Sequence, residues 1–290
     1  MRSLVRPHPG NGLEGAMLAL RLTLLTVLLA AAEPGLTRVV ILLLVLPALL
    51  FPSVLRTPAV WLGIAMVIAI SIIHQWPLAD NHIYLIVYWS LAVFLALCSR
   101  RPDEFLSVSA RWLLAFVFLW ATIWKVVLSP DYMDGRFFRV QLLTDTRFTP
   151  VTRMLGVSEE QLAENRAYLQ PVPARRTVAN PRLVETPALR LTGKFLTWST
   201  ILLEAAVAFA FLLPWGRFTE RIRHGLLLTF CVVAYAIAPV AGFGWIIAAM
   251  GAAQGPEHRH RLRAAYAVVW FLILIYSEIR WGRLLFKLVA

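Results

Sequence analysis

The sequence predicts an all-α fold: a polytopic transmembrane helical bundle of eight, or nine, spans with one interfacial helical segment on the outer side. Three observations predict it. The 290 residues are 59% hydrophobic and only 15% charged, and their mean hydropathy is +0.70, whereas soluble domains are about 45–50% apolar and about 25% charged. The apolar residues gather in runs whose lengths are close to about 20 residues, the length that a helix needs to cross a bilayer. This composition excludes a disordered chain, a disulfide-stapled secreted module and an ordinary cytosolic enzyme.

Seven apolar runs each predict one crossing, and a longer one, 225–253, predicts one or two. This longer run carries no charge, but Pro239, Gly242 and Gly244 interrupt it. The interruption indicates a broken helix with a half-helix beside the bundle, or else two short crossings. The first run ends on three alanines that resemble a signal-cleavage site, but Arg21 interrupts it, which favours a span. The seven single runs are 16–32, 36–52, 58–73, 83–98, 110–128, 194–214 and 264–279.

Basic residues set the predicted orientation, because short cytoplasmic loops are enriched in Lys and Arg. With a cytoplasmic N-terminus, Arg38 lies outside, and the C-terminal trios 259–263 and 280–287 lie on opposite faces. The side of the C-terminus therefore depends on the span count. We attribute the net charge of +12 to basic residues that anchor the protein at the lipid bilayer, and we expect no nucleic-acid binding. The Arg-rich, Ala- and Leu-rich composition indicates a bacterial protein of the inner membrane. The inner side holds Arg2, Arg6, Arg56, Arg100, Arg101, Arg111, Arg217, Arg221 and Arg223.

Three parts are predicted: N-terminal transmembrane helices over 1–128 (about five spans), a periplasmic cap over 129–193, and C-terminal transmembrane helices over 194–290 that include the broken helix. Within the cap, aromatic and basic residues over 129–148 predict an interfacial amphipathic helix. Ser158 and Gln161 form a capping box that opens a helix over 159–169. Four prolines then predict extended chain over 171–187. The cap is interpreted as a lid or partner-docking surface, or alternatively as a passive connector.

Two ionisable residues inside predicted spans are candidate site residues. Lys125 follows 13 uncharged residues of the fifth span, and Glu204 lies about ten residues into the sixth. Lys125 either reaches the outer interface along lipid or faces a drier site, where desolvation would make it a usable base. A carboxylate at that depth indicates a functional site, or a structural partner for a cation such as Lys125.

A second candidate group precedes the fourth span. Asp80 or Asn81 is expected to cap that helix, which places His82 in its first turn. A histidine there is either simply solvated or part of a site. The histidines have no zinc-ligand spacing, and Cys98 and Cys231 fit small buried hydrophobes, so no metal is predicted.

Two stretches carry a resemblance to a known family. The run Asp80-Asn81-His82-Ile83-Tyr84-Leu85 is similar to the Asn-Asn-His-x-Tyr-Leu segment of vitamin K-dependent γ-carboxylases. The run from Phe118 to Lys125, followed by 129–135, is similar to that family's Tyr-Phe-x-Ala-Gly-x-x-Lys…Asp-Trp-x-x-Gly segment. Glu204 and the broken apolar stretch follow in the same order. The resemblance covers about residues 75–250 and only the membrane module, also called the HTTM (horizontally transferred transmembrane) domain.

The resemblance implies a site on the periplasmic side that acts on a reduced quinone. Lys125 would be the base and His82 its catalytic partner, and Glu204, Asn81, Trp124 and Asp131 would bind the substrate. Two alternatives remain: a non-catalytic scaffold that docks a partner protein through 129–193, and a transporter. The transporter is less favoured, because no inverted repeat is visible.

Overall fold

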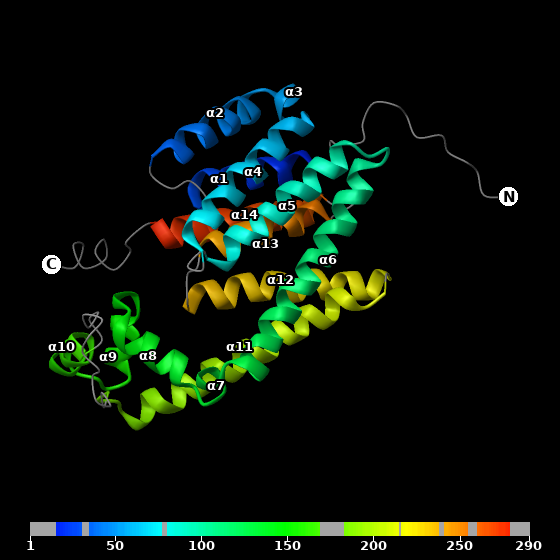
Figure 1. Cartoon of the computed structure of the whole chain (residues 1–290). Coiled ribbons are helices and arrows are strands. Elements are labelled where there is room, and N and C mark those ends of the chain that lie inside the picture. The colour runs from blue at the N-terminus through cyan, green and yellow to red at the C-terminus, as the bar shows by residue number, and fades with distance from the viewer. Residues whose placement is uncertain are drawn as a thin grey trace. The chain divides into compact units, whose positions relative to one another are not determined.

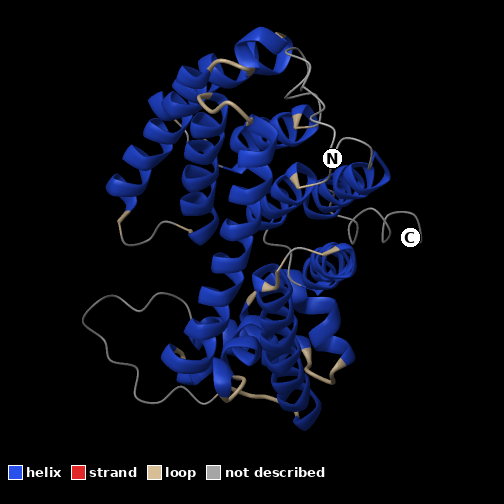
Figure 2. Ribbon diagram, turned by 90° about the vertical axis from the view of Figure 1, so that its right-hand side faces the viewer, coloured by secondary structure: helices blue, strands red, loops and turns tan. Residues whose placement is uncertain are grey.

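The computed structural model describes residues 16–30, 35–76, 80–168, 183–214, 216–237, 241–254 and 260–278. Every regular element in these ranges is a helix (Figures 1 and 2). The all-α class predicted from the sequence is therefore confirmed for the described residues. The predicted extended chain over 171–187 lies largely outside them, as do the C-terminal basic trio and the interruption at Pro239.

The first helices are α1 (Met17–Ala30), α2 (Leu36–Leu50), α3 (Pro52–Leu55), α4 (Pro58–Gln75), α5 (Asn81–Leu97) and α6 (Pro102–Ile123), which continues as a π-helix, η1 (Trp124–Leu128). The following ones are α7 (Pro130–Met133), α8 (Arg136–Thr144), the 3₁₀ turn η2 (Thr146–Phe148), α9 (Thr149–Met154) and α10 (Glu159–Tyr168). The last are α11 (Pro187–Leu212), α12 (Arg217–Ile237), α13 (Ala241–Ala253) and α14 (His260–Glu278).

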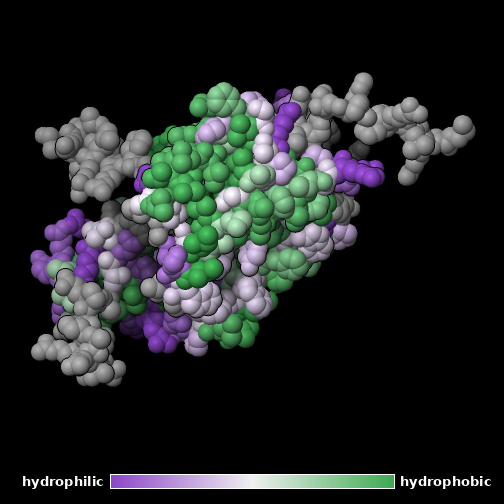
Figure 3. Space-filling model, turned by 45° about the horizontal axis from the view of Figure 1, so that its top comes forward, coloured by the Kyte–Doolittle hydropathy of each residue, from purple (hydrophilic) through white to green (hydrophobic). Residues whose placement is uncertain are grey.

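Three of the described helical stretches are long and apolar enough to cross a membrane: Pro58–Gln75, Pro102–Leu128 and Pro187–Leu212. Shorter apolar helices, among them α1, α2 and α5, coincide with other predicted spans. Apolar side chains at spacings of three and four stay exposed on α2, namely Leu36, Val39, Leu43, Leu46 and Leu50. Figure 3 shows apolar side chains spread over the face it presents. A helical membrane protein is supported, and the count of eight or nine spans stays a prediction.

The chain packs as two compact units, each described by itself. Unit 1 comprises Met1–Val117 and Val207–Ala290, and unit 2 comprises Phe118–Ala206. Both α6 and α11 continue from one unit into the other. The three predicted parts follow the expected membrane crossings, whereas packing groups the two ends of the chain together.

Helix α1 occupies the interior of unit 1 and carries polar links to two other helices. Thr23 and Thr26 each donate a hydrogen bond of 2.8 Å to the carbonyl four residues earlier. Their hydroxyl oxygens then accept hydrogen bonds from the indole N–H groups of Trp89 on α5, at 2.9 Å, and Trp270 on α14, at 3.0 Å. All four side chains are buried, so each indole nitrogen is satisfied without water.

Helix α13 also lies inside unit 1, where it contacts α1, α5, α12 and α14. Its residues from Trp245 to Ala253 are all buried, and two of its glycines lie against large neighbouring side chains. At Gly251 an added Cβ would overlap the ring of Tyr266, and at Gly244 it would overlap Tyr235. The expectation of a half-helix beside the bundle is therefore wrong: small residues let α13 pack within it.

Unit 2 has a small core of its own. Thr152 and Asn165 are fully buried and satisfied by backbone: Thr152 donates to the Leu142 carbonyl at 2.8 Å, and the Asn165 amide exchanges two hydrogen bonds with Val184. The predicted capping box is confirmed, since Ser158 N–H donates to Gln161 Oε1 at 3.0 Å and Gln161 N–H donates to Ser158 Oγ at 3.2 Å.

The prediction of a single amphipathic helix over 129–148 is wrong in one respect. The segment divides into α7, α8 and η2. Gly135 separates α7 from α8 with φ of 79°, a left-handed conformation that an L side chain adopts only with strain. This break turns α8 back toward α11, where it forms one wall of a cavity considered below.

Candidate functional site

The candidate site is built where α6 loses its regular α-helical spacing. The last five residues of this membrane-length helix, Trp124–Leu128, are π-helical, and Lys125 is the second of them. A π-helical turn inserts one extra residue and redirects the side chains that follow, and such turns occur frequently at functional sites. The insertion therefore changes the direction of Lys125 relative to the rest of α6.

Lys125 pairs with Glu204 of α11, 79 residues later in the chain. Its Nζ lies 2.7 Å from Oε1 and 2.6 Å from Oε2 of Glu204. The two side chains are only 13% and 9% exposed. Of the two interpretations of Lys125, the drier environment is thus the one found in the structure. Of the two interpretations of Glu204, the structure shows the one in which its carboxylate is the partner of Lys125. A functional site can contain such a pair.

An aromatic group covers the ion pair. The centroid of the Tyr132 ring lies 5.2 Å from Lys125 Nζ, within the range of a cation–π interaction. Tyr132 itself stacks on Phe137 at 4.6 Å and meets the edge of Phe138 at 5.7 Å. Burial, and then the carboxylates of Glu204 and Asp131, raise the pKa of the Tyr132 phenol. Tyr132 is therefore a neutral hydroxyl at physiological pH.

Two glycines allow the turn that carries Tyr132 to lie directly on α11. A Cβ at Gly135 would lie 3.2 Å from the backbone nitrogen of Lys194. A Cβ at Gly193 would lie 2.6 Å from Cγ of Arg139, a distance that real Cβ atoms do not reach. The close approach of α7 and α8 to α11 thus depends on both positions lacking a side chain.

The other predicted site residues lie as follows. Trp124 is 59% exposed and Asp131 is exposed, both in unit 2. Asn81 and His82 belong to unit 1 and start α5, which confirms that His82 is in its first turn. Asn81 is exposed, and Asp80 occupies the predicted N-cap position, although its side chain makes no capping hydrogen bond.

His82 is half-buried beside a helix start. A Cβ added at Gly242, at the beginning of α13, would overlap the His82 imidazole and approach Ala30. The imidazole therefore packs directly on the backbone at Gly242, where any side chain would collide with it. The structure brings Lys125, Glu204 and Tyr132 together within unit 2, and it describes His82 within unit 1.

Two buried polar groups in unit 1 were not predicted from the sequence: a pair of arginines and a histidine–tyrosine pair. Arg111 donates from Nε to the Phe211 carbonyl at 2.9 Å, and Arg223 donates from Nε to the Ala210 carbonyl at 3.3 Å. The sequence predicts both arginines on the cytoplasmic side, and in the structure their side chains bind carbonyls at the end of α11, where the helix dipole favours cations. His224 Nδ1 also lies 2.8 Å from the Tyr266 hydroxyl in the buried interior. No local sequence signal pairs residues so distant in the chain.

No family model, curated protein or solved structure matches this chain. Among the described residues, no group of three or more His, Cys, Asp or Glu side chains could hold a metal ion. Lys125, Glu204 and Tyr132 therefore define the candidate site by their geometry.

Removing one partner of the ion pair should destabilise the protein more than removing both. Glu204→Gln leaves an ammonium buried, and Lys125→Met leaves a carboxylate buried; each should lower the free energy of unfolding by about 3–5 kcal/mol. The double variant Lys125→Met/Glu204→Gln should recover much of that loss. Denaturant unfolding of the purified protein in detergent measures all three variants.

The exposed pair Arg101–Glu104, whose side chains are 79% and 65% exposed, is the matched control. Changing either residue to its uncharged analogue should alter the free energy of unfolding by less than about 1 kcal/mol. If the losses from the two single variants at 125 and 204 simply add in the double variant, the pair is not coupled as described.

Proposed function

We propose that the protein is a multi-pass membrane protein in which Lys125 and Glu204 form a proton-exchange site at the outer membrane face. Its substrate would be lipophilic and carry an acidic hydroxyl, of which a quinol is the class implied by the resemblance to the γ-carboxylase and HTTM module. The observation that carries the proposal is the bidentate Lys125–Glu204 pair, which is almost fully buried at a π-helical turn under Tyr132.

The pair can make Lys125 a base without changing its net charge. Moving one proton from Nζ to a Glu204 oxygen at 2.6–2.7 Å converts the ion pair into an amine and a carboxylic acid. Low-dielectric surroundings make this transfer accessible, because burying a charge costs far more than burying a hydrogen-bonded neutral group. The amine then has a free lone pair.

In the proposed step, the Lys125 amine accepts the proton of a substrate hydroxyl. The O–H bond breaks, a new N–H bond forms, and the substrate oxygen keeps the electron pair as an oxyanion beside the ammonium. Glu204 retains the proton it received. A lysine can act as a base in this way, whereas an arginine stays charged. His82 is proposed to support the transfer, on the resemblance alone.

The residues around the pair have the chemistry that a reduced quinone needs. Tyr132, Phe137 and Phe138 form an aromatic cluster suited to stacking on a planar ring. Trp124, Val127 and Leu128 leave apolar surface exposed beside Lys125, where a lipophilic tail could lie. When bound, a quinol would supply the acidic hydroxyl.

An alkylated naphthol tests the proposal, because its ionised form absorbs at longer wavelength than its neutral form. Added to the full-length protein in lipid nanodiscs, the bound naphthol should absorb as naphtholate at a pH below its pKa in solution. Lys125→Arg keeps the positive charge but cannot deprotonate, so it should lose at least about tenfold of the naphtholate signal. Arg101→Met, at an exposed ion pair, should behave as the wild type.

Two results would contradict the proposal: no binding of naphthol by the wild type, or an unchanged naphtholate signal in Lys125→Arg. Either result would favour the alternative in which the chain is a scaffold that docks a partner protein through 129–193. A scaffold would need the charge of Lys125 and its contribution to stability, but it would not need Lys125 to lose a proton.

The proposal includes a topology of eight spans in a bacterial inner membrane, with the N-terminus in the cytoplasm and 129–193 in the periplasm. Cys98, which is exposed after the fourth predicted span, would then face the cytoplasm, and Cys231 is buried. A membrane-impermeant maleimide should leave Cys98 unlabelled in intact spheroplasts and label it after lysis. An added cysteine at the exposed residue Ala167, in a Cys98→Ser background, should be labelled before lysis. Labelling of Cys98 in intact spheroplasts would reverse the orientation.

A further inference from the structure

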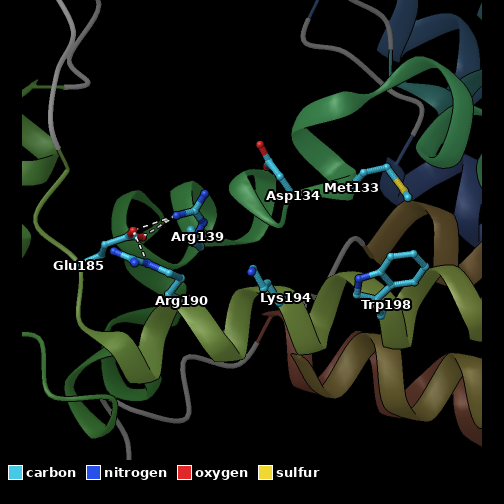
Figure 4. A pocket seen from close by; sticks show the side chains of 7 residues that line it. All are labelled: Met133, Asp134, Arg139, Glu185, Arg190, Lys194 and Trp198. Carbon is cyan, nitrogen blue, oxygen red and sulfur yellow. Dashed lines mark hydrogen bonds and ion pairs between the residues drawn. The ribbon is translucent and has the colours of Figure 1, made fainter.

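A cavity of about 560 Å³ lies in unit 2 between α11 and the turn from α7 to α8 (Figure 4). Its volume is within the range of small-molecule sites, about 300–1,000 Å³. Arg190, Lys194 and Trp198 project into it from one face of α11, at spacings of four residues, and Arg139 of α8 lies opposite. Three cations therefore converge on one concave surface.

Negative charge in the cavity is insufficient to neutralise these cations. Glu185 is shared, because its Oε1 accepts hydrogen bonds from Arg139 at 2.8 Å and from Arg190 at 3.0 Å. The other carboxylate, Asp134, is engaged by Arg136, with Nη2 at 2.7 Å from Oδ2, and this pair lowers the pKa of Asp134. Lys194 makes no ion pair or hydrogen bond with the residues that the structure describes.

A second observation points to a missing acceptor. The Nε–H of Arg139 is buried and has no hydrogen-bond partner within the described part of the chain. An unsatisfied buried donor costs about 1–3 kcal/mol, and more when it is charged. The Cγ of Arg139 packs against Gly193, where a Cβ would lie 2.6 Å away, and Glu185 accepts a hydrogen bond from its Nη1 at 2.8 Å. The guanidinium thus has a partner for Nη1 and unused donor capacity at Nε.

The position of the cavity along α11 indicates what kind of anion would reach it. Helix α11 has 26 residues, which is about 39 Å at 1.5 Å per residue and longer than the about 30 Å hydrocarbon layer. Because the span predicted from the sequence begins at residue 194, the first two turns of α11, with Arg190 and Lys194, extend to the level of the headgroups. Next to them, Leu191, Phe195 and Leu202 are 71%, 68% and 65% exposed, an apolar surface suited to acyl chains.

We infer that this cavity, which we call the α11 groove, binds the phosphate group of an anionic phospholipid, whose acyl chains lie along the exposed apolar side of α11. Phosphate oxygens would accept hydrogen bonds from Lys194, Arg190 and the unpaired Arg139 Nε–H, as arginine forks and lysine commonly do. Trp198, at the apolar end of the groove, is a residue typical of the membrane interface. The inference is independent of proton transfer at Lys125.

Thermal unfolding of the full-length protein in a neutral detergent tests this inference, with short-chain phosphatidylglycerol, short-chain phosphatidylcholine or inorganic phosphate added in separate arms. Phosphatidylglycerol should raise the unfolding temperature in a saturable manner, whereas the other two should not. Lys194→Gln should weaken the apparent phosphatidylglycerol affinity by about tenfold, the loss expected for one charge-assisted hydrogen bond. Lys194→Gln is expected to fold, because Lys194 contributes no ion pair to the described structure.

Arg101→Gln, which removes an exposed cation elsewhere, is the control and should leave the affinity unchanged. Native mass spectrometry of the same samples should show one fewer retained phosphatidylglycerol in Lys194→Gln. Equal stabilisation by inorganic phosphate would identify free phosphate as the ligand, and equal stabilisation by phosphatidylcholine would identify a general lipid effect; both overturn the inference. Unchanged affinity in Lys194→Gln also overturns it.

Discussion

The proposed site depends on the buried ion pair between Lys125 and Glu204. An ammonium and a carboxylate inside a predominantly apolar chain are each very costly alone, and together they are tolerated only in excellent geometry. The two short hydrogen bonds supply that geometry. They connect the end of α6 to the middle of α11, two helices long enough to cross a membrane.

The surroundings of the pair follow from this requirement. The π-helical turn redirects Lys125, and Tyr132 covers the ammonium with an aromatic face. Gly135 and Gly193 let the turn that carries Tyr132 lie on α11. The same close packing forms the wall of the α11 groove, so one pair of glycines supports both the proposed proton-exchange site and the proposed lipid site. The two sites use different charged groups and can be tested separately.

The sequence predicted what depends on local pattern. Helices formed where apolar runs lie, and the Ser158–Gln161 capping box formed because both partners are three residues apart. Lys125 and Glu204 were conspicuous because charges in apolar runs are rare, although only the structure shows that they meet. The break at Gly135 and the arginines at the end of α11, such as Arg223, were not predictable. Those features depend on contacts between distant segments, which a single sequence does not record.

The burial and pairing of Lys125 can be measured by the reactivity of the lysines toward an amine-specific reagent, followed by mass spectrometry of each peptide. Lys194 is exposed and serves as an internal reference for Lys125. We expect Lys125 to react far more slowly than Lys194 between pH 7 and 9, because Lys125 is buried and bound to Glu204, and we expect Glu204→Gln to raise its reactivity by removing that partner. Equal rates for the two lysines in the wild-type protein would contradict a buried, carboxylate-bound Lys125.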